Sequence, residues 1–458
     1  MSAKRATSVY ESQVRVSLGL AAVLSVLLGL MLMLPFTGGY FSGAAAALGG
    51  LTLLALCCFV VLISQPYHFR EALPHTFRTV CSWPSILLLG FFAVKMVHDG
   101  LAWQASTGLR GSGNHILWSM VYVGCGFLIL SYPVQVCRWR VAFMAAALAF
   151  YSIGNVIGYQ LGMAPHIATY GTVKAIDGSS IMERIIVPFG PGLNNFGCFL
   201  ALGIQVNLIA AWLAWRARDG LLMLIAIIGV LSCSYVIFLA QIRSGLIGLF
   251  FAVGFVAAPL HLKRWIALGA GLGMLLLPVA FFRLAAVNWL PAIVPHSLEE
   301  RIERNANEFV VLGGRAYIYD YGLDLLLKGE VGLTGMGMVK RDSSPVAAEF
   351  AADVEGATLS FHNGALEILI VYGPLIGCCL LGVILAPLFL RVPNGWRSEQ
   401  DSYVAMQGVL GSLCVTSYLE AFTSMWIFWM VAIVAIVSLV QLKKLPGNSQ
   451  HSADGATT

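Results

Sequence analysis

Residues 221–240 read LLMLIAIIGVLSCSYVIFLA, and none of these side chains is charged. An α-helix rises about 1.5 Å per residue, so this stretch is long enough to cross the roughly 30 Å hydrocarbon layer of a bilayer. Lipid offers no partner for backbone N–H and C=O groups, and a helix pairs these groups within the segment itself. The stretch therefore predicts a transmembrane helix.

Similar apolar stretches recur along the whole chain. Hydrophobic residues make up 59% of the 458 residues and charged residues only 11%, whereas a soluble globular protein carries roughly 25% charged residues. The sequence predicts an all-α polytopic membrane protein with about twelve transmembrane helices. The predicted spans are 17–36, 41–64, 83–98, 116–133, 141–163, 193–215, 221–240, 245–262, 265–283, 374–390, 403–420 and 424–441. The span at 83–98 is short and contains Lys95.

The distribution of Lys and Arg predicts the orientation of these helices. If the N-terminus lies inside, every inside segment carries at least two positive charges. The outside turns near 37–40 and 421–423 carry none, and the turn at 241–244 carries only Arg243. Because cytoplasmic loops carry the excess of Lys and Arg, both termini are expected in the cytoplasm. The net charge of +5 follows from this bias and gives no reason to expect a nucleic-acid partner.

The predicted spans divide the chain into four parts. Residues 1–283 hold helices one to nine, 284–373 form a large periplasmic loop, 374–441 hold the last three helices, and 442–458 form a cytoplasmic tail. Within the loop, Ala316, Tyr319, Leu323 and Leu326 recur at helical spacing, so the loop should contain short helices that dock on the membrane body. A long ordered loop in a compact protein is usually functional. We therefore expect the functional site in this loop.

Two arginines lie on the predicted outer face. Arg243 occupies the short turn between two spans, where it either extends to the lipid headgroups or binds a lipid-linked phosphate through its planar fork of donors. Arg315 follows a pair of glycines and begins the predicted loop helix. Taken alone, such an arginine is more often part of a solvated helix face.

A histidine precedes a predicted helix at the end of the loop, in LSFHNGALEILIVYGPLIG at 359–377. Asn363 is a good N-cap, and an apolar stripe leads from it to Gly373 and Pro374. His362 would then lie beside the positive end of a helix dipole, which disfavours the charged imidazole. A neutral imidazole on the outer face is suited to act as a general base. The alternative is a histidine that is only hydrogen-bonded near the helix start.

Metal sites are not indicated by the sequence. The ten cysteines lie in predicted spans or at their ends, with no spacing that suits zinc. Glu349, Asp353 and Glu355 are candidate ligands for a divalent cation, but carboxylates this close together in a loop are more often solvated. We expect no metal and no soluble cofactor.

The order of Arg243, Arg315 and the histidine-led helix resembles the O-antigen ligase and polymerase superfamily. The matching pieces are RSG at 243–245, GGR at 313–315 with the following LTGMGM, and the 359–377 stretch. The resemblance covers roughly residues 190–441 and leaves the N-terminal third unmatched. The very short outer turn at 421–423 departs from the pattern, with only Tyr418 and Glu420 beside it as polar candidates.

The resemblance implies a membrane glycosyltransferase at the periplasmic face of the bacterial inner membrane. Such enzymes move a glycan from undecaprenyl diphosphate to an acceptor, which for the ligases is the lipid A–core oligosaccharide. Arg243 and Arg315 would hold the diphosphate and stabilise its developing charge, and His362 would activate the acceptor hydroxyl. Direct attack would invert the anomeric centre. Further substrate contacts are expected from Asn194, Asn195 and Tyr319.

Three functions remain open at this point. A ligase is favoured because both arginines and the histidine occur together in the expected order. A polymerase would use the same lipid-linked donor but pass the glycan to another lipid-linked repeat. A transporter or flippase should instead carry ionisable residues in mid-span and show repeated halves, and neither feature is evident in the sequence.

Overall fold

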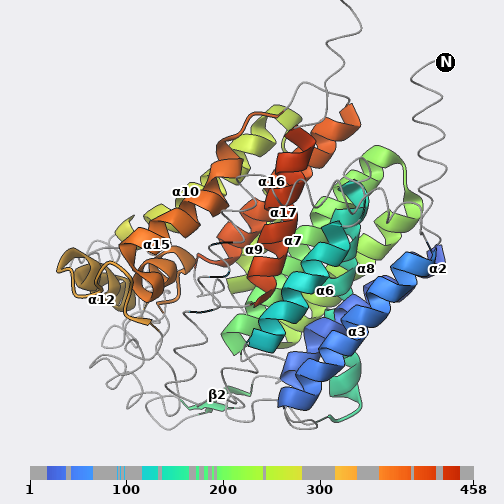
Figure 1. The fold of residues 1–458 in the computed structure, drawn as a ribbon, viewed down its shortest axis with the longest axis horizontal. Helices are drawn as coiled ribbons and strands as arrows, with labels where there is room; N and C mark the ends of the chain where they lie inside the picture. Colours follow the sequence, from blue (N-terminus) through green and yellow to red (C-terminus); the bar gives the residue numbers. More distant parts are fainter. Residues whose placement is uncertain are drawn as a thin grey trace, which may run out of the picture.

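The structure is a computed structural model. It describes residues 18–37, 43–64, 90, 93, 97, 116–130, 132, 137–163, 172–174, 180–183, 188–189, 193–240, 244–280, 315–337, 361–392, 397–418 and 426–443. These residues form a helical bundle with one small antiparallel strand pair (Figure 1).

The helices follow the apolar stretches of the sequence. In chain order they are α2 (Leu18–Met33) with the short 3-10 turn η1 (Leu34–Phe36), α3 (Gly43–Ser64), the helix Ile116–Leu130, α6 (Cys137–Gln160), α7 (Leu193–Ala217), α8 (Gly220–Ala240), α9 (Ser244–Ala257), α10 (Leu260–Ala280), α12 (Arg315–Leu327), α15 (Gly364–Phe389), α16 (Arg397–Thr416) and α17 (Trp426–Lys443).

The helical membrane character predicted from composition is confirmed. Six helices are long and apolar enough to cross a bilayer, namely α6, α7, α8, α10, α15 and α17, and four shorter apolar helices accompany them within the described residues. The count of about twelve spans stays a prediction. The predicted span at 83–98 lies outside the described residues apart from single positions.

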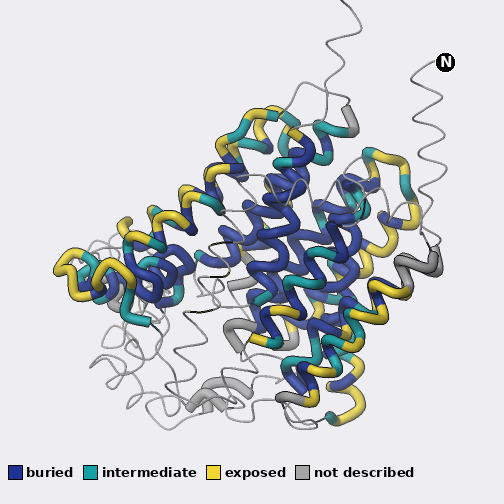
Figure 2. Tube along the Cα trace, in the orientation of Figure 1, coloured by how far each residue is buried: buried dark blue, intermediate teal, exposed yellow. Residues whose placement is uncertain are grey.

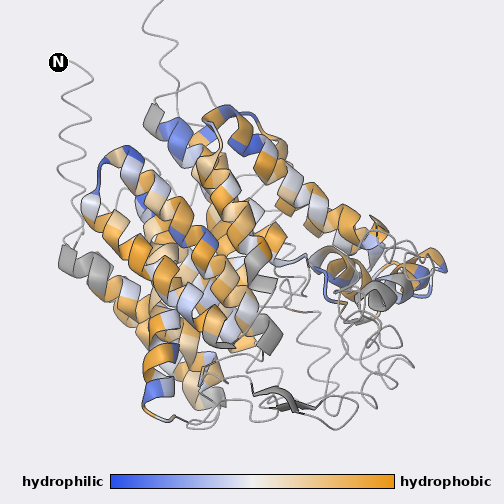
Figure 3. Cartoon of the chain, turned by 180° about the vertical axis from the view of Figure 1, so that it is seen from behind, coloured by the Kyte–Doolittle hydropathy of each residue, from blue (hydrophilic) through white to orange (hydrophobic). Residues whose placement is uncertain are grey.

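The bundle has a buried centre and a lipid-facing rim. In the most apolar 18-residue stretch of α7 and of α17, 89% of the residues are buried inside the protein, whereas in that of α8 only 33% are. Figure 2 shows the central helices mostly buried and exposed residues along α8 and α10. The exposed side chains on the rim are large and apolar, such as Leu224, Phe238 and Phe250. Figure 3 shows that the helices of the bundle are hydrophobic over most of their length. Because water would make such a surface unfavourable, the rim matches a lipid environment.

Polar contacts define the two ends of the bundle. At one end, Arg216 of α7 forms an ion pair with Asp401 of α16 at 2.9 Å. We call this the Arg216 end. On it, the Arg264 guanidinium of α10 lies 3.4 Å from the Phe389 carbonyl at the end of α15. We call the opposite end, where α15 begins, the His362 end. Among the described residues, Arg216 and Arg264, both predicted in inside segments, lie at the Arg216 end.

The boundary between α9 and α10 corrects a prediction. The sequence predicted spans at 245–262 and 265–283 with Lys263 and Arg264 in the connection, but α9 ends at Ala257 and α10 begins at Leu260. Pro259 carries no N–H and therefore precedes a helix more readily than it continues one. Lys263 lies buried inside α10, and its ammonium group donates to the carbonyl groups of Phe255 and Val256 at the end of α9.

A second difference concerns the loop predicted at 164–192. Strands β1 (Thr172–Lys174) and β2 (Ser180–Glu183) pair antiparallel there, with Thr172 opposite Glu183 and Val173 opposite Met182. The sequence predicted no strand. Runs of three and four residues are too short to show an alternating pattern that sequence reasoning could detect.

Candidate functional site

His362 adopts a backbone conformation that is uncommon outside glycine. Its φ is +48°, in the left-handed region, and its side chain is half-buried. Non-glycine residues in this region cost about 1–3 kcal/mol and persist where the surrounding structure holds them. Among the described residues only Arg218 shares this feature outside glycine. The strain therefore marks His362 as a position that the fold maintains.

Asn363 fixes the start of α15, as the sequence predicted. Its side-chain oxygen accepts hydrogen bonds from the backbone N–H groups of Ala365 and Leu366, both at 3.0 Å. Its side-chain nitrogen donates to the carbonyls of Met274 at 3.1 Å and Tyr418 at 3.2 Å. One amide side chain thus caps the helix and ties it to α10 and to the end of α16. Because Asn363 is fixed in this way, the backbone of the preceding residue, His362, is fixed as well.

Tyr319 of α12 also contacts the backbone near the start of α15. It is fully buried, and its hydroxyl lies 3.1 Å from the carbonyl oxygen of His362 and 3.0 Å from that of Tyr418. The predicted loop helix is confirmed, because α12 packs on α15 through a small core that includes Tyr319, Phe361 and Ile370. The Tyr319 hydroxyl thus ties α12 to the backbone at His362 and to the end of α16.

Tyr418 and its neighbour join the site from the end of α16. The Tyr418 hydroxyl donates to the Ala270 carbonyl at 2.8 Å, and the Ser417 carbonyl accepts from the N–H of Gly364 at 2.8 Å. The sequence offered Tyr418 only as a polar residue near a short turn. A Cβ on Gly273 would overlap the Tyr418 hydroxyl and ring, so this glycine lets Tyr418 lie against α10, a contact that the sequence does not reveal.

A close contact between two glycines joins the LTGMGM segment to α15. Gly335 and Gly373 both have positive φ, at +88° and +79°. A Cβ on either one would overlap the backbone of the other, and the N–H of Met336 donates to the Ile370 carbonyl at 2.9 Å. Gly373 also kinks α15 in mid-course. The glycines therefore allow the loop after α12 to lie directly on the helix that His362 leads.

This contact gives a stability prediction. Gly373→Ala should destabilise the protein by about 2–4 kcal/mol, because it places a side chain at positive φ and against the backbone of Gly335. The measurement is thermal unfolding of the purified protein in detergent. Gly382→Ala in the same helix is the matched control, since nothing lies within 4 Å of a Cβ there, and it should leave the protein equally or more stable. Equal effects of the two changes would contradict the assigned contact.

Arg315 is the first residue of α12, where the sequence predicted a helix to begin. It lies four residues before Tyr319, so the two positions share one face of the helix. Tyr319 uses that face to reach the backbone of His362. The Arg315 side chain itself lies outside the described part of the structure.

Arg243 lies outside the described residues, but the helices on either side of it are described. α8 runs from Gly220, near Arg216, to Ala240. The end of α9 contacts Lys263, which also lies 4.8 Å from the ring of Trp212 at the Arg216 end. The end of α8 and the start of α9 at Ser244 therefore face the His362 end.

A buried polar contact links α9 to the site. Gln205 of α7 packs against Gly248 in the first turns of α9, where an added Cβ would overlap its amide. The same amide nitrogen donates to the Thr416 hydroxyl at 3.0 Å, at the end of α16 beside Ser417. The helix that follows Arg243 is thus linked, through Gln205 and the end of α16, to Gly364 at the start of α15.

The remaining predicted residues are placed only in part. Asn194 and Asn195 lie in the first turn of α7, and their side chains are outside the described part of the structure. The acidic residues Glu349, Asp353 and Glu355 fall outside it entirely. Within the described residues, no three His, Cys, Asp or Glu side chains gather in a way that would hold a metal ion.

The described residues thus place a half-buried histidine with positive φ at the start of a membrane helix. Its carbonyl accepts from Tyr319, and the next two residues, Asn363 and Gly364, bond to α10 and to the end of α16. Neither a scan against protein-family models nor a search of curated proteins finds a match to the chain.

Proposed function

We propose that the chain is an O-antigen ligase. It transfers a glycan from undecaprenyl diphosphate to the lipid A–core oligosaccharide at the periplasmic face of the bacterial inner membrane. The proposal rests on the resemblance in the sequence and on one structural observation, the strained and well-supported backbone of His362. Backbone strain of this kind gathers at functional sites, and here it falls on a residue type suited to proton transfer.

In the proposed reaction, the acceptor hydroxyl attacks the anomeric carbon of the lipid-linked glycan. The hydroxyl proton passes to the imidazole of His362 while the new C–O bond forms. The bond between the anomeric carbon and the diphosphate breaks, and the electron pair leaves on the diphosphate, which is already a stable anion. Arg243 and Arg315 balance its charge in the transition state. The configuration of the anomeric carbon is inverted because no covalent enzyme intermediate forms.

Deleting the gene and inspecting the lipopolysaccharide ladder tests this function. A ligase predicts loss of every O-antigen band together with accumulation of lipid-linked polymer. A core that carries a single repeat would assign the chain as a polymerase, which is the alternative with the same donor. An unchanged ladder would contradict both and favour a transporter of another substrate.

A further prediction concerns metal ions. If two arginines supply the positive charge that a divalent cation supplies in other glycosyltransferases, transfer should continue unchanged in the presence of EDTA. The measurement is transfer from purified lipid-linked donor in detergent, with and without chelator. Loss of activity with EDTA and recovery with Mg²⁺ or Mn²⁺ would assign the acidic cluster of Glu349, Asp353 and Glu355 a role instead.

A further inference from the structure

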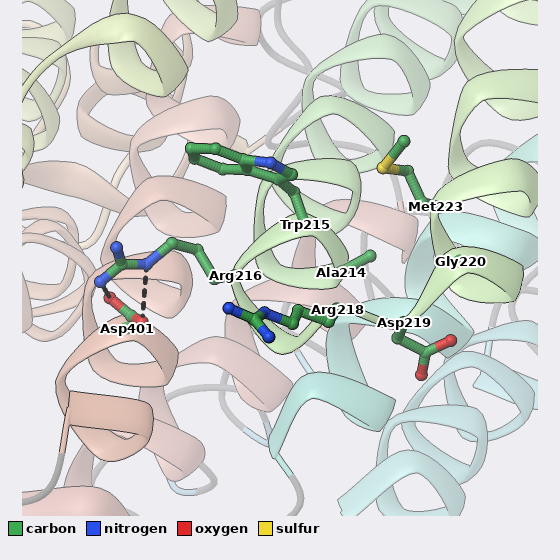
Figure 4. A pocket seen from close by; sticks show the side chains of 8 residues that line it. All are labelled: Ala214, Trp215, Arg216, Arg218, Asp219, Gly220, Met223 and Asp401. Carbon is green, nitrogen blue, oxygen red and sulfur yellow. Dashed lines mark hydrogen bonds and ion pairs between the residues drawn. The ribbon is translucent and has the colours of Figure 1, made fainter.

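A cavity of about 700 Å³ opens at the Arg216 end of the bundle, away from His362. It lies between the end of α7, the start of α8 and the first turns of α16, and Figure 4 shows the side chains that line it. Three of these are Arg216, Arg218 and Asp401. No part of the proposed glycan transfer uses this cavity.

The charges in the cavity are not all paired. The Asp401 carboxylate holds Arg216 through two hydrogen bonds, of 2.9 and 3.0 Å. The Asp219 carboxylate caps α8 by accepting from the N–H of Leu222 at 3.1 Å. Among the described residues, no ion pair or hydrogen bond engages the exposed guanidinium of Arg218. One positive charge of the cavity is therefore left for a ligand.

Arg218 stands at a position where glycine is the usual residue. Its φ is +55°, and it ends α7 in the C-terminal motif that glycine commonly supplies. Its own N–H donates to the Trp215 carbonyl at 3.2 Å, and the next N–H donates to the Ala214 carbonyl at 2.8 Å. In Figure 4 its side chain points toward Arg216 and away from Asp219. Two guanidinium groups thus face the same side of the cavity.

The surroundings of the cavity are those of a membrane surface. α8, which forms one wall, is the most lipid-exposed of the long apolar helices described. Trp215 lies at the rim with 67% of its surface exposed, and tryptophan favours the level of the lipid headgroups. Met223 adds an apolar contact on the α8 side. A ligand here would have its charged part between the arginines and its apolar part along α8.

We propose that this cavity binds the headgroup of an anionic phospholipid, with the phosphate held by Arg218 and the free edge of Arg216. Arginine suits this ligand because its planar donors match phosphate oxygens. Basic pockets between transmembrane helices are a known means of holding anionic headgroups. The site is independent of the proposed glycan transfer, so either proposal can fail without the other.

The test uses Arg218→Gly in the full chain. Glycine accepts the positive φ at no steric cost, so this change removes the guanidinium while the fold keeps equal or greater stability. Native mass spectrometry of the detergent-purified protein, titrated with dioleoyl-phosphatidylglycerol, measures binding. We expect about tenfold weaker binding of this lipid to Arg218→Gly, with thermal unfolding at the same or a higher temperature.

Three comparisons decide the result. The exposed Arg391 follows α15 and does not line the cavity, so Arg391→Ala should bind phosphatidylglycerol as the native protein does. The native protein should bind dioleoyl-phosphatidylcholine more weakly, and an excess of inorganic phosphate should not displace the phosphatidylglycerol. Unchanged binding by Arg218→Gly, an equal loss in Arg391→Ala, equal binding of both lipids, or displacement by inorganic phosphate would each overturn the proposal.

Discussion

Replacing His362 with glycine is expected to lower the rate of glycan transfer by about 10²–10⁴-fold while leaving the protein folded. The structure makes glycine the most informative change, because the φ of +48° is a conformation that glycine adopts freely. Tyr319 contacts the backbone carbonyl of residue 362. The helix cap is made by the side chain of Asn363. Neither requires the imidazole.

The two explanations of His362 therefore predict opposite results. If the side chain acts as a general base, the glycine variant should unfold at the native temperature or above it, bind the lipid-linked donor and fail to transfer. If the histidine only completes the helix start, glycine should preserve activity. His362→Asn, which tolerates the same backbone region but takes up no proton at neutral pH, should fail equally. The control is His261→Ala, which removes an exposed histidine at the start of α10 and should transfer normally.

Much of the helical architecture could be predicted from the apolar runs alone. Stretches such as 221–240 and 193–215 became α8 and α7 nearly to the residue, because a membrane helix must be both long and uncharged. The same rule misplaced the connection between α9 and α10, because it assigns charged residues to loops and not to membrane helices. Lys263 was taken to mark a loop, yet its ammonium group folds back onto the carbonyls of α9 inside the protein. A buried partner for a charge is not visible in a sequence.

The candidate site was predictable in its local parts and not in its assembly. Asn363 as a cap and α12 as a helix follow from short-range rules, and both are confirmed. The contact between Gly335 and Gly373 joins two segments that are far apart in the sequence, and no hydrophobic periodicity indicates that they meet. That Tyr319 contacts substrate stays a prediction; the structure shows it buried, with its hydroxyl 3.1 and 3.0 Å from two backbone carbonyls. The positive φ of His362 likewise arises from tertiary contacts.

The proposed diphosphate site depends on the shape of the guanidinium group as well as on its charge. Arginine offers a rigid fork of donors that matches two phosphate oxygens, whereas lysine carries a single ammonium group on a flexible stem. Arg315→Lys and Arg243→Lys should therefore each lower transfer by about 10²-fold or more, in the range found when one transition-state donor is lost. Binding of the lipid-linked donor should weaken as well.

Stability should not explain the loss at Arg315. Lysine and arginine have nearly equal helix propensities, and Arg315 is the first residue of α12, so the helix should form equally well in the variant. Arg391→Lys, at an exposed arginine beyond the end of α15, is the matched control and should retain native activity. The measurement is transfer from purified lipid-linked donor at equal amounts of folded protein. A nearly active Arg315→Lys would reduce this residue to a surface charge, and the diphosphate would then have to be held by other donors at the His362 end.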